Sequence, residues 1–283
     1  MPQTSKTDKT MMIGKIDVAE QLHQFFFSLL KHREAPQFFR KNHLWKGVWR
    51  YGWFTRILIV IVLLVGMNLL MILWRWWWKA DLDNLGDAVS SMGLLVTDFA
   101  KEGSQYLFMG GTKYVILILM EVFIFHICRR TVAILTGKDS ASSFDEFIKA
   151  QIRMIRVSIR SWIRESIVIL LIGVVFGMAG IWGFMKPVLI FAVQCYYLGF
   201  TLIDNYNEQF GLSVKESARY TYNNYVGATL GLGLVLNILL FIPLLGAVIA
   251  PFLSAVTATL VMYELSDLHL LESELAVKLD DTL

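Results

Sequence analysis

The chain alternates between long apolar runs and short polar segments, a pattern typical of helices that enter a membrane. The longest run lies between Tyr220 and Tyr263, where no charged side chain occurs. About 20 helical residues cross a bilayer core, so this run is too long for one crossing and must fold back on itself. Pro243 and Pro251 interrupt it and mark where the turn is expected. The pattern predicts a membrane-embedded helical hairpin over about Tyr225–Ile242 and Leu244–Tyr263.

Other apolar runs extend this arrangement. Two transmembrane spans are predicted at about residues 55–77 and 113–135. A second hairpin is predicted from Ser166–Met185 and Pro187–Ile203, with its turn at Lys186 and Pro187. The predicted fold class is therefore all-α, a polytopic helical membrane protein with two long transmembrane helices and two membrane-embedded helical hairpins.

The first arm of each hairpin carries two glycines four residues apart. These pairs are Gly173 with Gly177 and Gly227 with Gly231, and such spacing lets helix backbones pack closely in lipid. The arms are also short, because an arm such as 225–242 spans roughly 27 Å as a helix. They either cross fully or enter partway and turn. Partial entry requires that the turn be buried in protein, which predicts an oligomer or a water-lined cavity.

The ends of the chain are polar, which divides it into three parts. Residues 1–11 are predicted to be a disordered tail, residues 12–265 a single membrane domain, and residues 266–283 an acidic cytoplasmic tail. Within the membrane domain, apolar residues recur at helical spacing from Ile13 to Arg33. They predict an amphipathic helix that lies on the inner membrane surface.

Composition and charge support these assignments and orient them. Hydrophobic residues make up 56% of the 283 residues and charged residues 17%, whereas soluble domains have about 25% charged residues. Lys and Arg number seven in residues 31–56, three in 79–113 and eight in 129–164. The positive-inside rule places the N-terminus and residues 129–164 in the cytoplasm and residues 79–113 outside.

The cytoplasmic segment is predicted to contain a helix. Ser143 and Glu146 form the pattern of a capping box that would open it. Along this helix arginines recur at intervals of three, four and four residues, at Arg153, Arg156, Arg160 and Arg164. They share one face, and such a face contacts lipid headgroups more often than it forms an anion funnel.

The second half of the chain resembles a known family. The matching features are Gly199-Phe200 before Asp204, Glu208, Gly211-Leu212-Ser213, Ile242-Pro243 and Ala250-Pro251-Phe252, with Leu44-Trp45-Lys46 and Phe144-Asp145 further upstream. In this order and spacing they resemble the CysZ-type sulfate permeases, part of the etoposide-induced-protein superfamily. The resemblance implies two long transmembrane helices, partly inserted hairpins, homo-oligomers and sulfate uptake in the bacterial inner (cytoplasmic) membrane. One departure is that residues 46–52 lack the Gly-Leu-Arg stretch of these permeases.

Candidate functional residues fall into three groups. Arg50, Arg56, Arg129 and Arg130 lie at the inner mouth of the two spans, where an oxyanion would find charge-assisted donors. The alternative for them is snorkelling at the membrane surface.

Glu121 and His126 lie inside the second span. They are candidates for a proton or ion relay, with a packing contact as the alternative. Asp204, Glu208, Pro243 and Pro251 are interpreted as structural motif residues, the two carboxylates as a cap or an ion pair.

These observations predict a membrane permease or channel for a small, sulfate-like inorganic oxyanion. The sequence contains no nucleotide-binding or enzyme motif and no metal-ligand spacing, so no cofactor and no metal are expected. The expected partners are membrane lipid, a small inorganic anion and further copies of the chain, and not nucleic acid. The alternative function is a non-transporting membrane scaffold that organises partners on the same fold.

Overall fold

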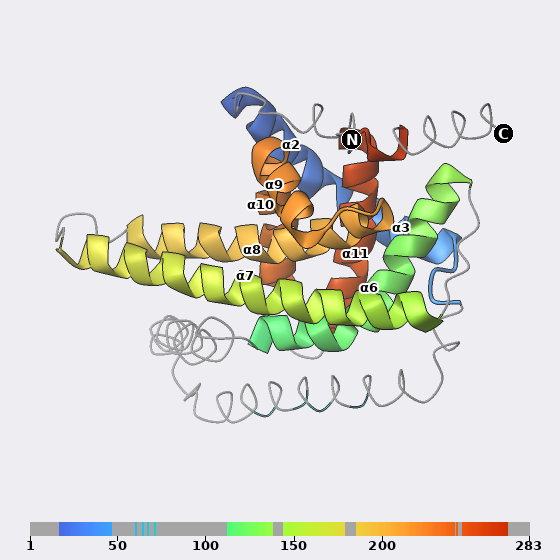
Figure 1. Ribbon diagram of the computed structural model, residues 1–283, viewed down its shortest axis with the longest axis horizontal. Coiled ribbons are helices and arrows are strands. Elements are labelled where there is room, and N and C mark those ends of the chain that lie inside the picture. The colour runs from blue at the N-terminus through green and yellow to red at the C-terminus, as the bar shows by residue number, and fades with distance from the viewer. Residues whose placement is uncertain are drawn as a thin grey trace, which may run out of the picture.

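The computed structural model describes residues 17–46, 112–137, 144–178, 185–240 and 245–270, together with single positions at 60, 64, 67, 71 and 242. These residues form helices and connecting turns and contain no strand, which confirms the all-α fold class (Figure 1). The helices are α2 (Val18–Lys31), α3 (Ala35–Lys41), α6 (Thr112–Thr136), α7 (Phe144–Met178), α8 (Met185–Gln209), α9 (Val214–Asn224), α10 (Val226–Leu240) and α11 (Leu245–Leu265).

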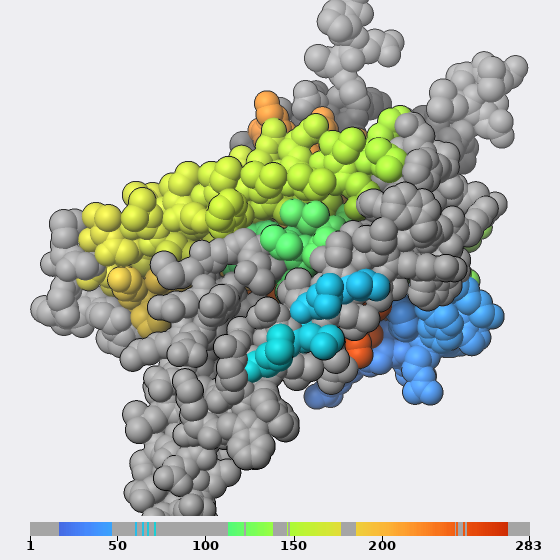
Figure 2. Space-filling view, turned by 90° about the horizontal axis from the view of Figure 1, so that it is seen from below, coloured from blue at the N-terminus to red at the C-terminus, as the bar shows by residue number. Residues whose placement is uncertain are grey.

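Several of these helices match the predicted membrane segments. Among the described residues, Met185–Gln209 and Val248–Leu265 are long and apolar enough to cross a membrane. The pair α9 and α10, bent by 102°, would make a third crossing if it is counted as one span. Helix α6 occupies the residues of the predicted second long span, but it is not among the helices that are long and apolar enough to cross. Most of the predicted first span lies outside the described residues, but its four described positions are helical and exposed at the spacing of one helix face: Val60, Leu64, Met67 and Met71 (Figure 2).

Helices α7 and α8 form the first hairpin, which lies lengthwise across the molecule (Figure 1). Its end projects beyond the other labelled helices, and apolar side chains there are exposed, Leu170 by 66% and Val188 by 64%. The turn was predicted at Lys186 and Pro187, and this was wrong. Helix α8 begins at Met185, so Pro187 stands in its first turn, where the missing N–H breaks no helical hydrogen bond.

Helix α8 packs against α10 through glycine contacts. A Cβ atom added to Gly199 would lie 1.8 Å from the Thr229 carbonyl oxygen, and one added to Gly233 would lie 1.7 Å from the Cys195 carbonyl oxygen. The predicted pair Gly227 and Gly231 also packs closely, but against α2. Gly173 makes no such contact within the described part of the chain, where no atom lies within 4 Å of the position of its Cβ.

Helix α2 confirms the helix predicted within residues 13–33, but its polar side faces the interior of the bundle. The Gln21 amide donates to the Asn224 carbonyl (3.1 Å) and accepts from the Gly227 N–H (2.7 Å), and Gln24 also donates to Asn224 (3.0 Å). These bonds satisfy backbone groups at the bend between α9 and α10, which lipid cannot do. The outward stripe of α2 is apolar and more than half exposed: Val18, Leu22, Phe26 and Leu30.

Helices α6 and α7 run antiparallel beside one another (Figure 2). Lys113 Nζ lies 2.6 Å from Glu165 Oε1 at one end, and Arg129 Nη1 lies 2.8 Å from Glu146 Oε2 at the other. The arginine-bearing half of α7 was expected beyond the cytoplasmic end of the second span. The two ion pairs place it alongside α6 instead, as the first half of one continuous 35-residue helix.

Substituting Gly199 tests the contact between α8 and α10. We expect Gly199→Ala to lower the free energy of unfolding by about 1–3 kcal/mol, because the new methyl group meets backbone rather than a movable side chain. Gly173→Ala is the matched control, since it adds the same methyl group where no described atom lies within 4 Å. Replacing a glycine inside a helix by alanine is expected to raise the free energy of unfolding by up to about 1 kcal/mol. Thermal unfolding in detergent, followed by circular dichroism, measures both. Equal stability of the two variants would contradict the close contact.

Candidate functional site

The end of α8 carries polar residues into the interior of the bundle. Asp204 and Asn205 are 3% exposed and Asn207 is fully buried. The sequence predicted that the apolar arm ends at Ile203, but the polar residues that follow continue the same helix. Helix α8 continues to Gln209, and the stretch is buried because α6, α7, α9, α10 and α11 all pack against α8. A polar helix end buried in this way needs partners from those neighbours.

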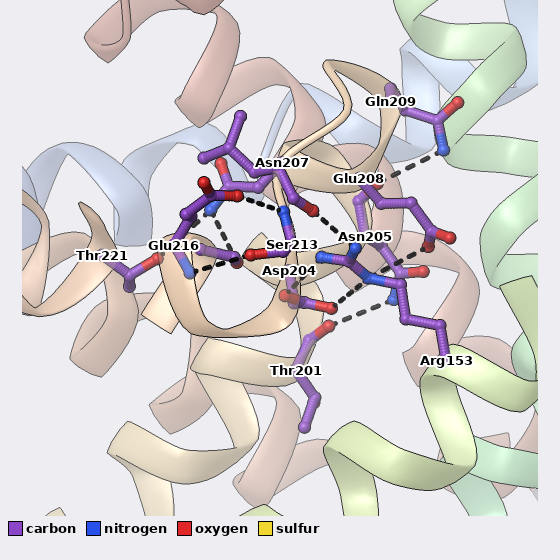
Figure 3. Close-up of polar contacts among 12 residues, drawn as sticks. Arg153, Thr201, Asp204, Asn205, Asn207, Glu208, Gln209, Ser213, Glu216 and Thr221 are labelled. Carbon is purple, nitrogen blue, oxygen red and sulfur yellow. Dashed lines mark hydrogen bonds and ion pairs between the residues drawn. The ribbon is translucent and has the colours of Figure 1, made fainter. Parts of the chain in front are cut away.

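Arg153 on α7 is the main partner of this helix end (Figure 3). Its Nε and Nη2 atoms donate to the two carboxylate oxygens of Asp204 at 3.0 and 2.9 Å. Its Nη1 atom donates to the Leu212 carbonyl oxygen (2.5 Å), and Glu208 Oε2 lies 3.6 Å from Nε. The planar guanidinium thus binds Asp204 in a two-pronged fork and also holds the turn that follows α8. Asp204 and Glu208 are therefore ion-pair residues.

Glu121 on α6 faces the same cluster. It is 1% exposed, and its charged neighbours are Glu208 and Asp204 on α8 and Arg153 on α7. The Asn205 side chain is its neutral polar neighbour, although neither carboxylate oxygen reaches full hydrogen-bond geometry with a residue that the structure describes. The cluster thus sets three carboxyl groups around one guanidinium, in surroundings where burying charge is costly. Within the described part of the chain, no group of His, Cys, Asp and Glu is placed to hold a metal ion.

A second buried ion pair joins the other end of α6 to α7. Lys113 is 2% exposed and donates to Glu165 Oε1 at 2.6 Å, while the Tyr114 hydroxyl donates to Glu165 Oε2 at 2.5 Å. Sequence reasoning missed this pair, although each residue is a charge that borders an apolar run. Such charges are candidates for pairing, but their spacing within one chain does not identify the partner.

The connection from α8 to α9 is held by further polar contacts (Figure 3). Asn207 donates to Ser217 (3.0 Å) and to Thr221 (3.3 Å). Ser213 and Glu216 form a capping box at the start of α9, with each side chain accepting from the other residue's backbone N–H. The sequence Ser-Val-Lys-Glu carries this signal, which sequence reasoning overlooked.

The predicted site residues occupy separate surroundings. Arg129 pairs with Glu146, while Arg130 and His126 both contact the Lys46 carbonyl oxygen, His126 at 3.1 Å. Glu121 instead faces α8, so the structure does not bring it to His126. Pro251 is buried inside α11. Arg50, Arg56 and Pro243 lie outside the described residues.

Removing Arg153 tests its place in the fold. We expect Arg153→Ala to lower the free energy of unfolding by about 3–5 kcal/mol, because Asp204 is left buried without its partner. Arg156→Ala removes an exposed arginine one turn away and is expected to cost less than about 0.5 kcal/mol. Denaturation in mixed detergent micelles compares the two, and equal losses would show that the fork to Asp204 contributes nothing specific.

Comparison with known proteins gives one match. A family model described as "Sulfate transporter CysZ/Etoposide-induced protein 2.4" matches residues 25–251, a range that includes Arg153, Asp204, Glu208 and the first turns of α11. Neither a curated protein nor a solved structure matches significantly. Because the family model covers most of the chain, this multi-pass membrane protein belongs to the sulfate transporter CysZ/etoposide-induced protein 2.4 family.

Proposed function

We propose that the chain is a membrane permease or channel for a small inorganic oxyanion of the sulfate type. The match to a sulfate transporter family over residues 25–251 is the observation that carries this proposal. Transport through it is passive and uses no nucleotide, because the sequence holds no phosphate-binding loop. The protein is not an enzyme and works without a cofactor.

The oxyanion-binding groups are Arg50, Arg56, Arg129 and Arg130. Arg129 and Arg130 occupy neighbouring positions on α6. Among the described residues, Arg129 pairs with the half-exposed Glu146 and Arg130 donates to the Lys46 carbonyl oxygen. An arriving oxyanion offers better acceptors than a carbonyl oxygen, because hydrogen bonds between two charged groups are about twice as strong as neutral ones. Glu121 and His126 face different helices, so they do not form one relay. His126 shares the Lys46 carbonyl oxygen with Arg130 and lies beside the proposed path, whereas Glu121 belongs to the Arg153 cluster away from it.

The chain works as a homo-oligomer in the bacterial inner membrane. The exposed apolar end of the α7–α8 hairpin supports this arrangement, because so much apolar surface must be covered by lipid or by another copy. An oligomer would also bury the turns of partly inserted hairpins, whose backbone groups lipid leaves unsatisfied.

The alternative function, a non-transporting membrane scaffold, has one observation in its favour. Lys113, Arg129, Arg130 and Arg153 all have protein partners, so each of these cations already has a structural role. In a scaffold these contacts would be permanent. In a permease those at Arg129 and Arg130 would exchange for the anion.

Uptake of labelled sulfate into proteoliposomes distinguishes the two functions. We expect saturable uptake that selenate blocks and chloride does not. Arg130→Gln is expected to raise KM for sulfate about tenfold, because a charge-assisted hydrogen bond is lost while the glutamine can still donate to Lys46.

Arg40→Gln, which removes an exposed arginine from α3, is the control and is expected to leave KM unchanged. Uptake no greater than in empty liposomes, with folded protein confirmed, would reject the permease and favour the scaffold.

A further inference from the structure

The outward face of α7 combines arginines with apolar side chains. Its buried side includes polar residues, Ser158, Ser161 and Glu165, besides Met154 and Val157. Its outward side exposes large apolar residues between 42% and 52%: Ile152, Ile155, Ile159, Trp162, Ile163 and Ile167. A helix in water places its apolar residues inward. The reversed arrangement on α7 indicates that this face does not contact bulk water.

Three arginines form a row on the same face. Arg156, Arg160 and Arg164 are exposed and recur every four residues, so successive side chains start about 6 Å apart along the helix. Among the described residues none of the three has an ion-pair partner. Arg153 begins the row in the sequence but is turned to Asp204. The row therefore presents three positive charges to whatever covers this face.

The position of the row within α7 identifies the covering layer. After Glu165, which is buried, and Ser166, the helix is wholly apolar from Ile167 to Met178, and Leu170, Leu171, Val174 and Val175 are each more than half exposed. This part forms the projecting end of the hairpin (Figures 1 and 2). A charged row that gives way to a lipid-facing apolar surface lies at the boundary between headgroups and acyl chains, where Trp162 is also favoured.

We propose that the Arg156–Arg160–Arg164 row is a binding surface for anionic phospholipid. The three guanidinium groups pair with headgroup phosphates, and the neighbouring isoleucines and Trp162 contact the acyl chains. Free sulfate or phosphate would satisfy the arginines but would leave the apolar side chains in water. A lipid satisfies both sets of groups at once. This surface is independent of transport and is unaffected if the proposed permease activity fails.

Lipid titration of the purified full-length chain tests this surface. Phosphatidylglycerol and phosphatidylcholine with the same acyl chains are added in detergent, and native mass spectrometry counts the lipids bound. We expect the wild type to bind phosphatidylglycerol about 30- to 100-fold more tightly than phosphatidylcholine, because each of the three arginines contributes about threefold to fivefold. In R156Q/R160Q/R164Q the affinity for phosphatidylglycerol should fall to that for phosphatidylcholine, while in R156K/R160K/R164K most of the preference should remain.

The matched control is K41Q/K215Q/R219Q, which removes three exposed positive charges from α3 and α9. It is expected to bind lipid like the wild type. Equal losses in the control and the arginine variant would show only an effect of net charge and would overturn the proposal. If the triple variant does not fold, Arg160→Gln alone is expected to weaken phosphatidylglycerol binding about threefold to fivefold, and an unchanged affinity would overturn the proposal.

Two further results would assign the face to another occupant. Complete displacement of phosphatidylglycerol by inorganic phosphate would make it a site for free oxyanions. Loss of an oligomer in the arginine variant, with lipid binding unchanged, would make it an interface between copies of the chain. Either result contradicts a phospholipid surface.

Discussion

Polar groups inside a bundle that lipid surrounds can be satisfied only by other helices, and this constraint accounts for most of the contacts described above. It explains why α2 and α7 turn polar residues inward and apolar residues outward. Gln21 and Gln24 satisfy the bend before α10, and Glu165 receives hydrogen bonds from Lys113 and Tyr114. In a water-soluble protein these polar groups would form hydrogen bonds with water, and the same helices would pack through their apolar faces.

Helix α8 is where the constraint acts most strongly. Its middle contacts the backbone of α10 at Gly199, and its end presents Asp204 to Arg153 five residues later. These two contacts fix α8 on opposite sides, one by close packing and one by a charged fork. Because close-packed helices transmit strain, a shift of α8 at Gly199 would also move Asp204 relative to Arg153. Packing and electrostatics at this site are therefore coupled.

The sequence pattern predicted the helices well because apolar runs and their periodicity are local properties. It located α6, both hairpins and the helix that begins at Phe144. It did not predict which faces meet. Gly173 and Gly227 stand in the same spacing, yet only Gly227 has a neighbouring backbone. Lys113 and Glu165 each border an apolar run in the sequence, and nothing in their spacing pairs them. They become partners because α6 and α7 pack antiparallel. Pro187 was interpreted as a turn because proline interrupts helices, but the first helical turn accepts it equally well.

The charge balance of the interior bears on where an anion can pass. Among the described residues, three carboxyl groups lie near the Arg153 guanidinium: those of Asp204, Glu208 and Glu121. Like charges at such distances repel strongly where the dielectric constant is low, and Arg153 already uses its donors on Asp204 and Leu212. An anion there would gain few hydrogen bonds and would meet repulsion. Arg130 on α6 donates instead to the Lys46 carbonyl oxygen, a neutral acceptor that an oxyanion can replace at lower cost. The proposed anion path therefore fits the surroundings of Arg130 better than those of Arg153, which stabilises the fold.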